Sequence, residues 1–214
     1  MLRFCAVLTS ASSLSISLPI QPGDGPKWVC NPHRIAETAK DRKRSGEAKC
    51  LVYSIGSNGD FTFETGLYDI LGKTLCEIHV FDPKDFSSAV PSTIAPMVHF
   101  HSWGIVGSKD PTAHNFKTLK QTVDLLGHKG KTVDIFKIDC EGCEWQTFQD
   151  WFHVDLDIRQ ILVEVHHVPE NANDFFETLQ DEGFVTFHKE PNTKYSGGMC
   201  QEYAFLKLDP YFFD

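Results

Sequence analysis

Residues 134–145 read D-I-F-K-I-D-C-E-G-C-E-W, and this stretch decides the fold. The apolar run 135–138 predicts a buried parallel strand that ends in a carboxylate, and Gly142 then opens a helical pattern. Three acidic residues gather at the junction: Asp139, Glu141 and Glu144. In open α/β sheets, ligands bind outside the carboxyl ends of the strands. The junction is therefore a candidate site.

Strand-like and helix-like segments alternate along the rest of the chain. The predicted strands are 50–55, 76–81, 97–102, 135–138, 160–165, 184–188 and 202–208. Helical spacing of apolar residues predicts helices after most of them, but the Gly-rich stretch 191–198 has no helical pattern. Parallel strands need a crossover connection, so we expect the last strand to be antiparallel. The sequence thus predicts an α/β fold with a doubly wound, mostly parallel seven-stranded sheet.

The composition fits one folded domain. The chain has 214 residues, of which 41% are hydrophobic and 23% charged, enough for a single α/β domain with a full core. We expect residues 1–27 to be an N-terminal extension, either a signal-like segment or a linker, and residues 28–214 to form the domain. Serines interrupt the first apolar run, so no transmembrane span is predicted, and cytoplasmic and secretory locations both stay open. The net charge of −9 argues against a nucleic acid or an anionic membrane as the main partner.

The seven cysteines are spread along a chain too large to need a disulfide framework. Cys50 and Cys76 begin predicted strands, and we interpret them as small buried hydrophobic residues. Cys140 and Cys143 form a C-x-x-C at a strand-to-helix junction, where a thioredoxin-type dithiol can lie. The flanking glutamates disfavour a thiolate, and no second C-x-x-C completes a zinc site. We therefore interpret this spacing as coincidence.

The turn G-S-N-G at 56–59 joins the first predicted strand of the sheet to its helix. Glycines let a nucleotide-type ligand approach the backbone, and the helix N-terminus offers unpaired N–H groups. Asp82 ends the next strand, where a carboxylate can accept hydrogen bonds from ribose hydroxyls, although it could also belong to a turn before Pro83. The third glycine of G-x-G-x-x-G is missing, and the sequence has no other pyrophosphate cradle. S-adenosylmethionine fits this pattern better than NAD.

Acid–base groups follow the fourth and fifth predicted strands. Asp139 ends the fourth, while Glu164 and His166 end the fifth and lie two positions apart, on one face. Together they could orient or deprotonate a substrate hydroxyl. They could also bind a hard divalent cation, but we favour a site without a metal. Glu164 has a structural alternative, an ion pair with Lys137, which lies in an otherwise apolar strand.

Several of these segments resemble a known family. F-K-I-D-C-E-G-C-E-W resembles the K-x-D-x-E-G-x-E segment of FkbM-type S-adenosylmethionine-dependent methyltransferases. V-Y-S-I-G-S-N-G-D-F-T-F-E, H-V-F-D-P and H-F-H-S-W-G-I are similar to methyltransferase-domain proteins of the "methyltransferase-like protein twenty-four" kind. The resemblance runs from about Trp28 to the C-terminus. It implies a class I, Rossmann-like methyltransferase fold and O-methylation of a hydroxyl on a small molecule or sugar.

The resemblance also implies roles for individual residues. The cofactor would be lined by Gly56, Ser57, Asn58 and Glu64, with Asp82 at the ribose and Trp103, Gly104 and Ile105 near the adenine. Asp139, Glu141 and Glu144 match the acids of the family, and Glu164 and His166 match its E-x-H strand end. Such proteins often carry more sequence before the fold. The rival interpretations are a nicotinamide-dependent oxidoreductase, a non-catalytic Rossmann-like binding module and a C-x-x-C redox protein.

Overall fold

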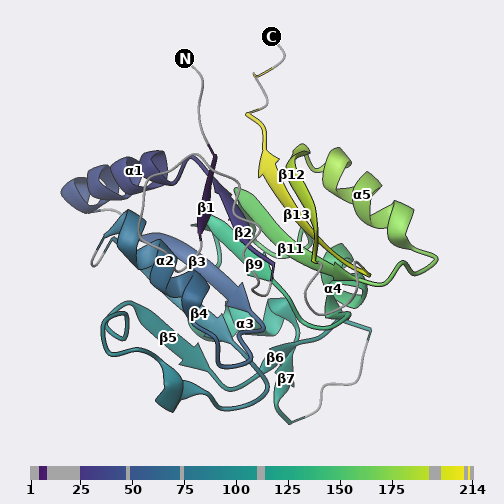
Figure 1. Cartoon of the computed structure of the whole chain (residues 1–214), viewed down its shortest axis with the longest axis horizontal. Coiled ribbons are helices and arrows are strands. Elements are labelled where there is room, and N and C mark those ends of the chain that lie inside the picture. The colour runs from purple at the N-terminus through teal and green to yellow at the C-terminus, as the bar shows by residue number, and fades with distance from the viewer. Residues whose placement is uncertain are drawn as a thin grey trace.

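The computed structural model describes residues 5–8, 25–46, 49–72, 75–109, 114–192, 199–209 and 212, and the structural statements below concern these residues. A seven-stranded sheet forms the centre of the molecule (Figure 1). Its strands are β3 (Cys50–Ile55), β4 (Cys76–Phe81), β5 (Val98–His101), β9 (Ile135–Ile138), β11 (Gln160–His166), β12 (Phe184–Asn192) and β13 (Cys200–Lys207). Their order across the sheet is β12-β13-β11-β9-β3-β4-β5.

The directions of the strands confirm the predicted topology. Five adjacent strands of the sheet run parallel to one another: β11, β9, β3, β4 and β5. Strand β13 is antiparallel to both β11 and β12. The chain therefore begins the sheet in its middle, at β3, winds outward in both directions and inserts its last strand between two earlier ones. This arrangement gathers the carboxyl ends of β3, β4, β9 and β11 at one edge.

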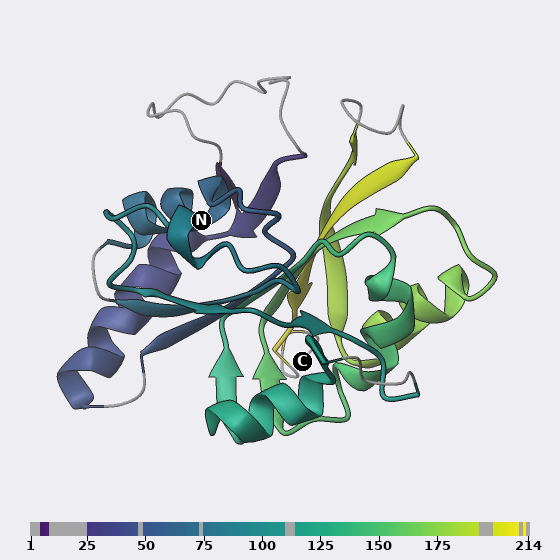
Figure 2. The ribbon, with the colours of Figure 1, turned by 90° about the horizontal axis from the view of Figure 1, so that it is seen from below.

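Helices cover both faces of the sheet (Figure 2). They are α1 (Pro32–Ser45), α2 (Thr62–Leu71), α3 (Leu119–Leu126), α4 (Cys143–Thr147) and α5 (Ala172–Asp181), with the 3₁₀ turns η1 (Ser87–Ala89) and η2 (Phe148–Asp150). Helices α1 and α2 pack on the face that carries Val52 and Leu162. Helices α3 and α5 pack on the opposite face around Tyr53, Phe136 and Trp151. Both faces are buried, which explains why the central strands are apolar at nearly every position.

Short strands complete the fold. They are β1 (Cys5–Leu8), β2 (Lys27–Cys30), β6 (Gly104–Ile105), β7 (Phe116–Lys117), β8 (Lys131–Val133) and β10 (Leu156–Ile158). Strands β1 and β2 pair antiparallel to each other, and β2 lies against β11 and β13. The Gln160 side chain bonds both backbone groups of Cys30, and the Trp28 indole stacks on His188 at 4.0 Å. Residues next to the predicted linker are therefore packed on the sheet, while the domain boundary itself stays a prediction.

Cys50 and Cys76 are buried in the core as expected, but two disulfides correct the rest of the cysteine interpretation. Cys50 and Cys76 are bonded to each other, and Cys140 and Cys143 form a second disulfide. The first pair could not be inferred from separate strand patterns, because it depends on β3 and β4 being neighbours with these two residues in register.

Among the residues placed in the structure, no helix is long and apolar enough to span a membrane.

Candidate active site

The G-S-N-G turn leaves β3 directly beside the end of β9. Gly56 has φ +76°, and a Cβ at this position would lie 1.7 Å from the backbone oxygen of Asp139. The position therefore requires glycine for both conformation and space. The predicted cofactor turn and the acidic junction are consequently in backbone contact.

Asp82 organises this turn from the end of β4. Its Oδ2 accepts hydrogen bonds from the backbone N–H groups of Ser57, at 3.1 Å, and Asn58, at 2.8 Å. Its Oδ1 accepts the N–H of Lys84 at 2.9 Å. A carboxylate oxygen has two lone pairs, so Oδ1 keeps one direction for a further donor such as a ribose hydroxyl. The predicted role of Asp82 in ribose binding stays a prediction.

Glu64 and Lys137 lie beneath the turn rather than in the acidic cluster. Lys137 Nζ donates hydrogen bonds to the backbone oxygens of Ile55 and Gly56. Glu64 on α2 is 1% exposed, and burial raises its pKa while the charge of Lys137 opposes the rise. The alternative in which Lys137 pairs with Glu164 is therefore wrong. Its ammonium instead stabilises the carbonyl groups where β3 ends.

The segment 103–105 follows β5 and adjoins the other side of Asp82. Gly104 and Ile105 are buried in β6, and Asn115 Nδ2 donates a hydrogen bond to the backbone oxygen of Pro83. The Trp103 ring lies 4.6 Å from the ring of His101, and its Nε1 donates to Thr122 Oγ1. The structure thus places the predicted adenine segment next to the predicted ribose residue.

A buried lysine holds the acidic cluster together. Lys27 Nζ lies 3.2 Å from Asp139 Oδ2, 3.3 Å from Glu164 Oε2 and 2.5 Å from Glu202 Oε1. Burial opposes the charge on Lys27, but the three carboxylates outweigh it and raise its pKa. Burial would raise the pKa of Asp139, but the positive charges of Lys27 and Lys137 outweigh burial and lower this pKa to about 2. For Glu202, burial prevails and raises the pKa well above its ordinary value.

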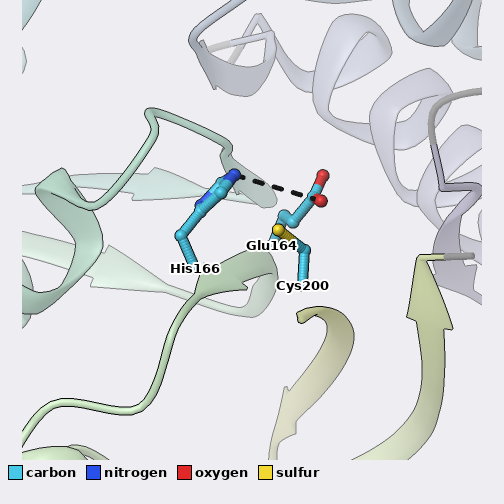
Figure 3. Close-up of side chains that lie close together, drawn as sticks. All are labelled: Glu164, His166 and Cys200. Carbon is cyan, nitrogen blue, oxygen red and sulfur yellow. Dashed lines mark ion pairs between the residues drawn. The ribbon is translucent and has the colours of Figure 1, made fainter. Parts of the chain in front are cut away.

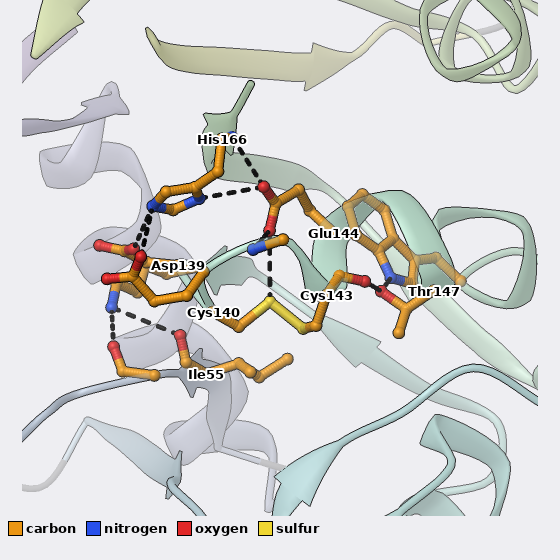
Figure 4. The surroundings of a disulfide bond; sticks show 12 residues. Ile55, Asp139, Cys140, Cys143, Glu144, Thr147 and His166 are labelled. Carbon is orange, nitrogen blue, oxygen red and sulfur yellow. Dashed lines mark hydrogen bonds and ion pairs between the residues drawn. A yellow bond between two sulfur atoms is a disulfide. The ribbon is translucent and has the colours of Figure 1, made fainter. Parts of the chain in front are cut away.

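His166 lies between two carboxylates (Figure 4). Its Nδ1 is 3.0 Å from Glu144 Oε1, which also accepts the backbone N–H of His166 at 2.7 Å. Its Nε2 faces Asp139 Oδ1 at 3.9 Å, Glu164 Oε1 at 4.0 Å and Glu141 Oε2 at 3.5 Å. Burial would lower the pKa of His166, but the hydrogen bond and charge of Glu144, together with Asp139 and Glu164, raise it to about 9. In this arrangement the ring is an imidazolium at neutral pH.

The structure therefore brings together all five acid–base residues of the predicted cluster, although Glu141 is 88% exposed at its side chain. The sequence interpretation missed Lys27 and Glu202. Glu202 had a usable signal, because it shares one face of the last strand with the apolar residues Ala204 and Leu206. Lys27 had none, since a lysine at the end of a Pro/Gly-rich stretch is ordinarily exposed.

A histidine cluster on the opposite face was also missed. His79 Nδ1 lies 2.9 Å from His101 Nε2, and Tyr53 Oη lies 2.7 Å from His128 Nδ1. Burial is the main cause that lowers the pKa of His79 to about 3 and those of His101 and His128 to about 4. These rings are therefore neutral. They come from β4, β5 and the turn after α3, so no local pattern connects them.

The strand order and the position of the turn define a class I, Rossmann-like methyltransferase fold. Residues 17–207 match a family described as "Methyltransferase domain", and the chain belongs to this family. No curated protein matches the sequence.

Three solved structures illustrate the wider likeness. An rRNA methylase from Streptococcus thermophilus has a TM-score of 0.48 and 10% identity, over 83% of this chain and 94% of that one. The second is the 1,6-didemethyltoxoflavin-N1-methyltransferase of Burkholderia thailandensis, with bound 1,6-didemethyltoxoflavin and S-adenosylhomocysteine. Its TM-score is 0.45 and its identity 12%, over 82% of this chain and 79% of that one. A SAM-dependent methyltransferase from Aquifex aeolicus has a TM-score of 0.45 and 11% identity, over 83% of this chain and 98% of that one. These likenesses are distant, and we infer no substrate from them.

Proposed function

We propose that the protein is an S-adenosylmethionine-dependent methyltransferase that methylates a hydroxyl group of a small molecule or sugar. The observation that carries this proposal is the contact between Gly56 and the backbone oxygen of Asp139. It joins the turn suited to the cofactor directly to the carboxylates suited to an acceptor. A methyl group held at the turn would face the acidic cluster without any movement of the sheet.

The proposed reaction is displacement at the methyl group of a sulfonium by a hydroxyl oxygen. Little covalent help is needed, because the donor is already cationic. Alignment of the two reactants can supply roughly 7–11 kcal/mol of the barrier reduction. In this proposal Asp139, next to Gly56, accepts a hydrogen bond from the acceptor hydroxyl and orients its oxygen. As the new oxygen–methyl bond forms and the sulfur–methyl bond of the sulfonium breaks, the Asp139 carboxylate takes the hydroxyl proton. His166 and Lys27 hold that carboxylate in place.

Three features support a small hydroxylated acceptor. The net charge of −9 opposes binding to a phosphate backbone. The segment 136–145 resembles the hallmark segment of FkbM-type methyltransferases, which supports O-methylation. A sugar or another polyol also matches a site in which several carboxylates can accept hydrogen bonds.

Calorimetric titration with S-adenosylhomocysteine, alongside NADH, tests the cofactor. We expect micromolar binding of S-adenosylhomocysteine, lost in Asp82→Ala and retained in the control Asp124→Ala, which removes an exposed carboxylate on α3. Circular dichroism must show that Asp82→Ala is folded, because this change also releases the amides of Ser57 and Asn58. Binding of NADH alone would favour an oxidoreductase, and binding of neither ligand would favour a non-catalytic module.

Transfer of a labelled methyl group tests the acceptor. The panel should contain sugars, other small alcohols and total RNA. Labelling of a small alcohol with a product stable to mild base supports the proposal. Labelling of RNA, or of a nitrogen atom, would overturn the acceptor assignment while leaving the cofactor assignment intact.

A further inference from the structure

We propose that Glu164, His166 and Cys200 form a binding site for a divalent transition-metal ion of the zinc type. Each residue offers one donor atom, and these three atoms lie within 4.8 Å of one another (Figure 3). The set contains a nitrogen, a sulfur and an oxygen. Such a mixture suits zinc or cobalt and disfavours magnesium or calcium, which prefer oxygen alone.

The sheet itself fixes the three side chains. His166 on β11 and Cys200 on β13 are directly paired in the antiparallel register. Glu164 lies two positions before His166 and therefore on the same face. All three residues are largely buried in regular strands, so the donor set is placed by a rigid scaffold rather than by a loop.

Glu144 supplies an independent reason to expect a metal. Its side chain is fully buried, and its Oε1 holds His166 Nδ1 at 3.0 Å. Its Oε2 accepts the backbone N–H of Gly142. A carboxylate bonded to the far nitrogen of a histidine is the arrangement that orients metal-binding histidines, because it leaves Nε2 to bind the ion. Here Nε2 faces Glu164, with Asp139 and Glu141 nearby.

The donor atoms lie within 4.8 Å of one another and would have to move closer together around a bound ion. Ligand atoms on a tetrahedral zinc ion lie roughly 3.3–3.7 Å apart, given bonds of about 2.0–2.3 Å. His166 Nε2 is 4.0 Å from Glu164 Oε1 and 3.9 Å from Asp139 Oδ1. Three protein ligands would leave a fourth ligand position unfilled, and Asp139 Oδ1 and Glu141 Oε2 lie 3.9 Å and 3.5 Å from His166 Nε2. An acceptor hydroxyl could bind there, and this last point alone rests on the proposed function.

Lys27 does not occupy the proposed site. It contacts Asp139 through Oδ2 and Glu164 through Oε2, whereas Oδ1 and Oε1 of the same residues face His166. The lysine thus neutralises one side of the two carboxylates, and the other side lies toward Nε2. Glu164 Oε1 also accepts a hydrogen bond from Asn192 Nδ2 at 3.0 Å, so one of its two lone pairs is left for an ion. A cation bound there would lie beside the carboxylate oxygens that face away from Lys27.

Cobalt(II) titration of the chelator-treated, dialysed full chain tests the site. We expect one cobalt ion per chain, with visible bands of a tetrahedral centre and a thiolate-to-cobalt charge-transfer band. Cys200→Ser should remove the charge-transfer band, and the matched control Cys30→Ser should keep it. Glu144→Gln should weaken binding by roughly 10–100-fold, and His166→Gln by more. Zinc should displace cobalt, whereas excess magnesium should not.

Three results would overturn the site: no cobalt uptake by folded protein, uptake unchanged in His166→Gln, or displacement by magnesium. Thermal unfolding of each variant, followed by circular dichroism, identifies samples that have simply lost the fold. S-adenosylhomocysteine titration on the same samples keeps the two proposals apart. Cofactor binding without cobalt uptake overturns the metal site alone, and cobalt uptake without cofactor binding overturns the proposed function alone.

Discussion

Lys27 and Glu202 form a buried ion pair, with Nζ 2.5 Å from Oε1, although 175 positions separate them in the sequence. The pair joins β2 to the last strand of the sheet. Gly25 allows this approach, because a Cβ there would lie 2.3 Å from Glu202 Oε1. The same ammonium reaches Asp139 and Glu164. The segment before α1 therefore contributes to the candidate active site from outside the central alternation of strands and helices.

Replacing Lys27 with methionine should strongly destabilise the protein. The change leaves three largely buried carboxylates without their cation, and breaking a buried ion pair by removing one partner costs about 3–5 kcal/mol. Urea unfolding measures the free energy. The control is Lys49→Met, which removes an exposed ion pair with Glu77 and should cost at most about 1 kcal/mol. Equal losses in the two variants would contradict this account of Lys27.

Gly56→Ala should abolish binding of S-adenosylhomocysteine. The new methyl group would collide with the backbone of Asp139, so the turn must move away from β9. Gly46→Ala is the matched control, because Gly46 has nearly the same φ, +75°, but open space around it. We expect the control to lose about 1–2 kcal/mol of stability and to bind normally. Normal binding by Gly56→Ala, measured by calorimetry, would show that the turn does not contact the cofactor.

The histidine cluster should make stability depend on pH. An unfolded histidine binds a proton near pH 6.5, whereas His79, His101 and His128 have folded pKa values of about 3, 4 and 4. Between these values the unfolded chain binds more protons at these three residues, so their contribution to the free energy of unfolding falls as the pH is lowered from about 6.5 toward 4. The other groups that face the cluster are His99, Lys131, Glu77 and Tyr53.

Urea unfolding at several pH values, in the parent and in His79→Gln, measures this dependence. The variant should show a shallower loss of stability between about pH 6.5 and 5, since one titrating group is gone. His33→Gln, on the exposed side of α1, serves as the control. An unchanged slope in His79→Gln would mean that His79 takes up its proton without unfolding.

The Cys50–Cys76 disulfide should contribute to stability. It links neighbouring strands and closes a loop of 26 residues, for which about 2–4 kcal/mol is typical. We expect Cys50→Ala/Cys76→Ala to lose this amount in urea unfolding, and to bind S-adenosylhomocysteine once folded. Mass spectrometry after alkylation in denaturant without reductant should find Cys50, Cys76, Cys140 and Cys143 unlabelled. Labelling of these residues would show that the bonds do not form in solution.

Much of the fold and part of the site follow from local sequence. Apolar runs bounded by turn residues predicted the strands 50–55, 76–81 and 135–138 at their observed bounds. Asp139, Glu164 and His166 could be placed together because strand ends in a parallel sheet share one edge. Each of these inferences needs only the local pattern and the general geometry of the sheet.

Tertiary structure alone decided the contacts between segments distant in sequence. Four features depend on which strands become neighbours and in what register. They are the position of Lys27, the disulfide between β3 and β4, the histidine cluster and the pairing of His166 with Cys200. A shift of register by one residue would turn these side chains to the other face. The sequence by itself thus determined which strands would form and which carboxylates would end them. Only the packed sheet decided that a lysine would neutralise one side of those carboxylates and a histidine would face the other.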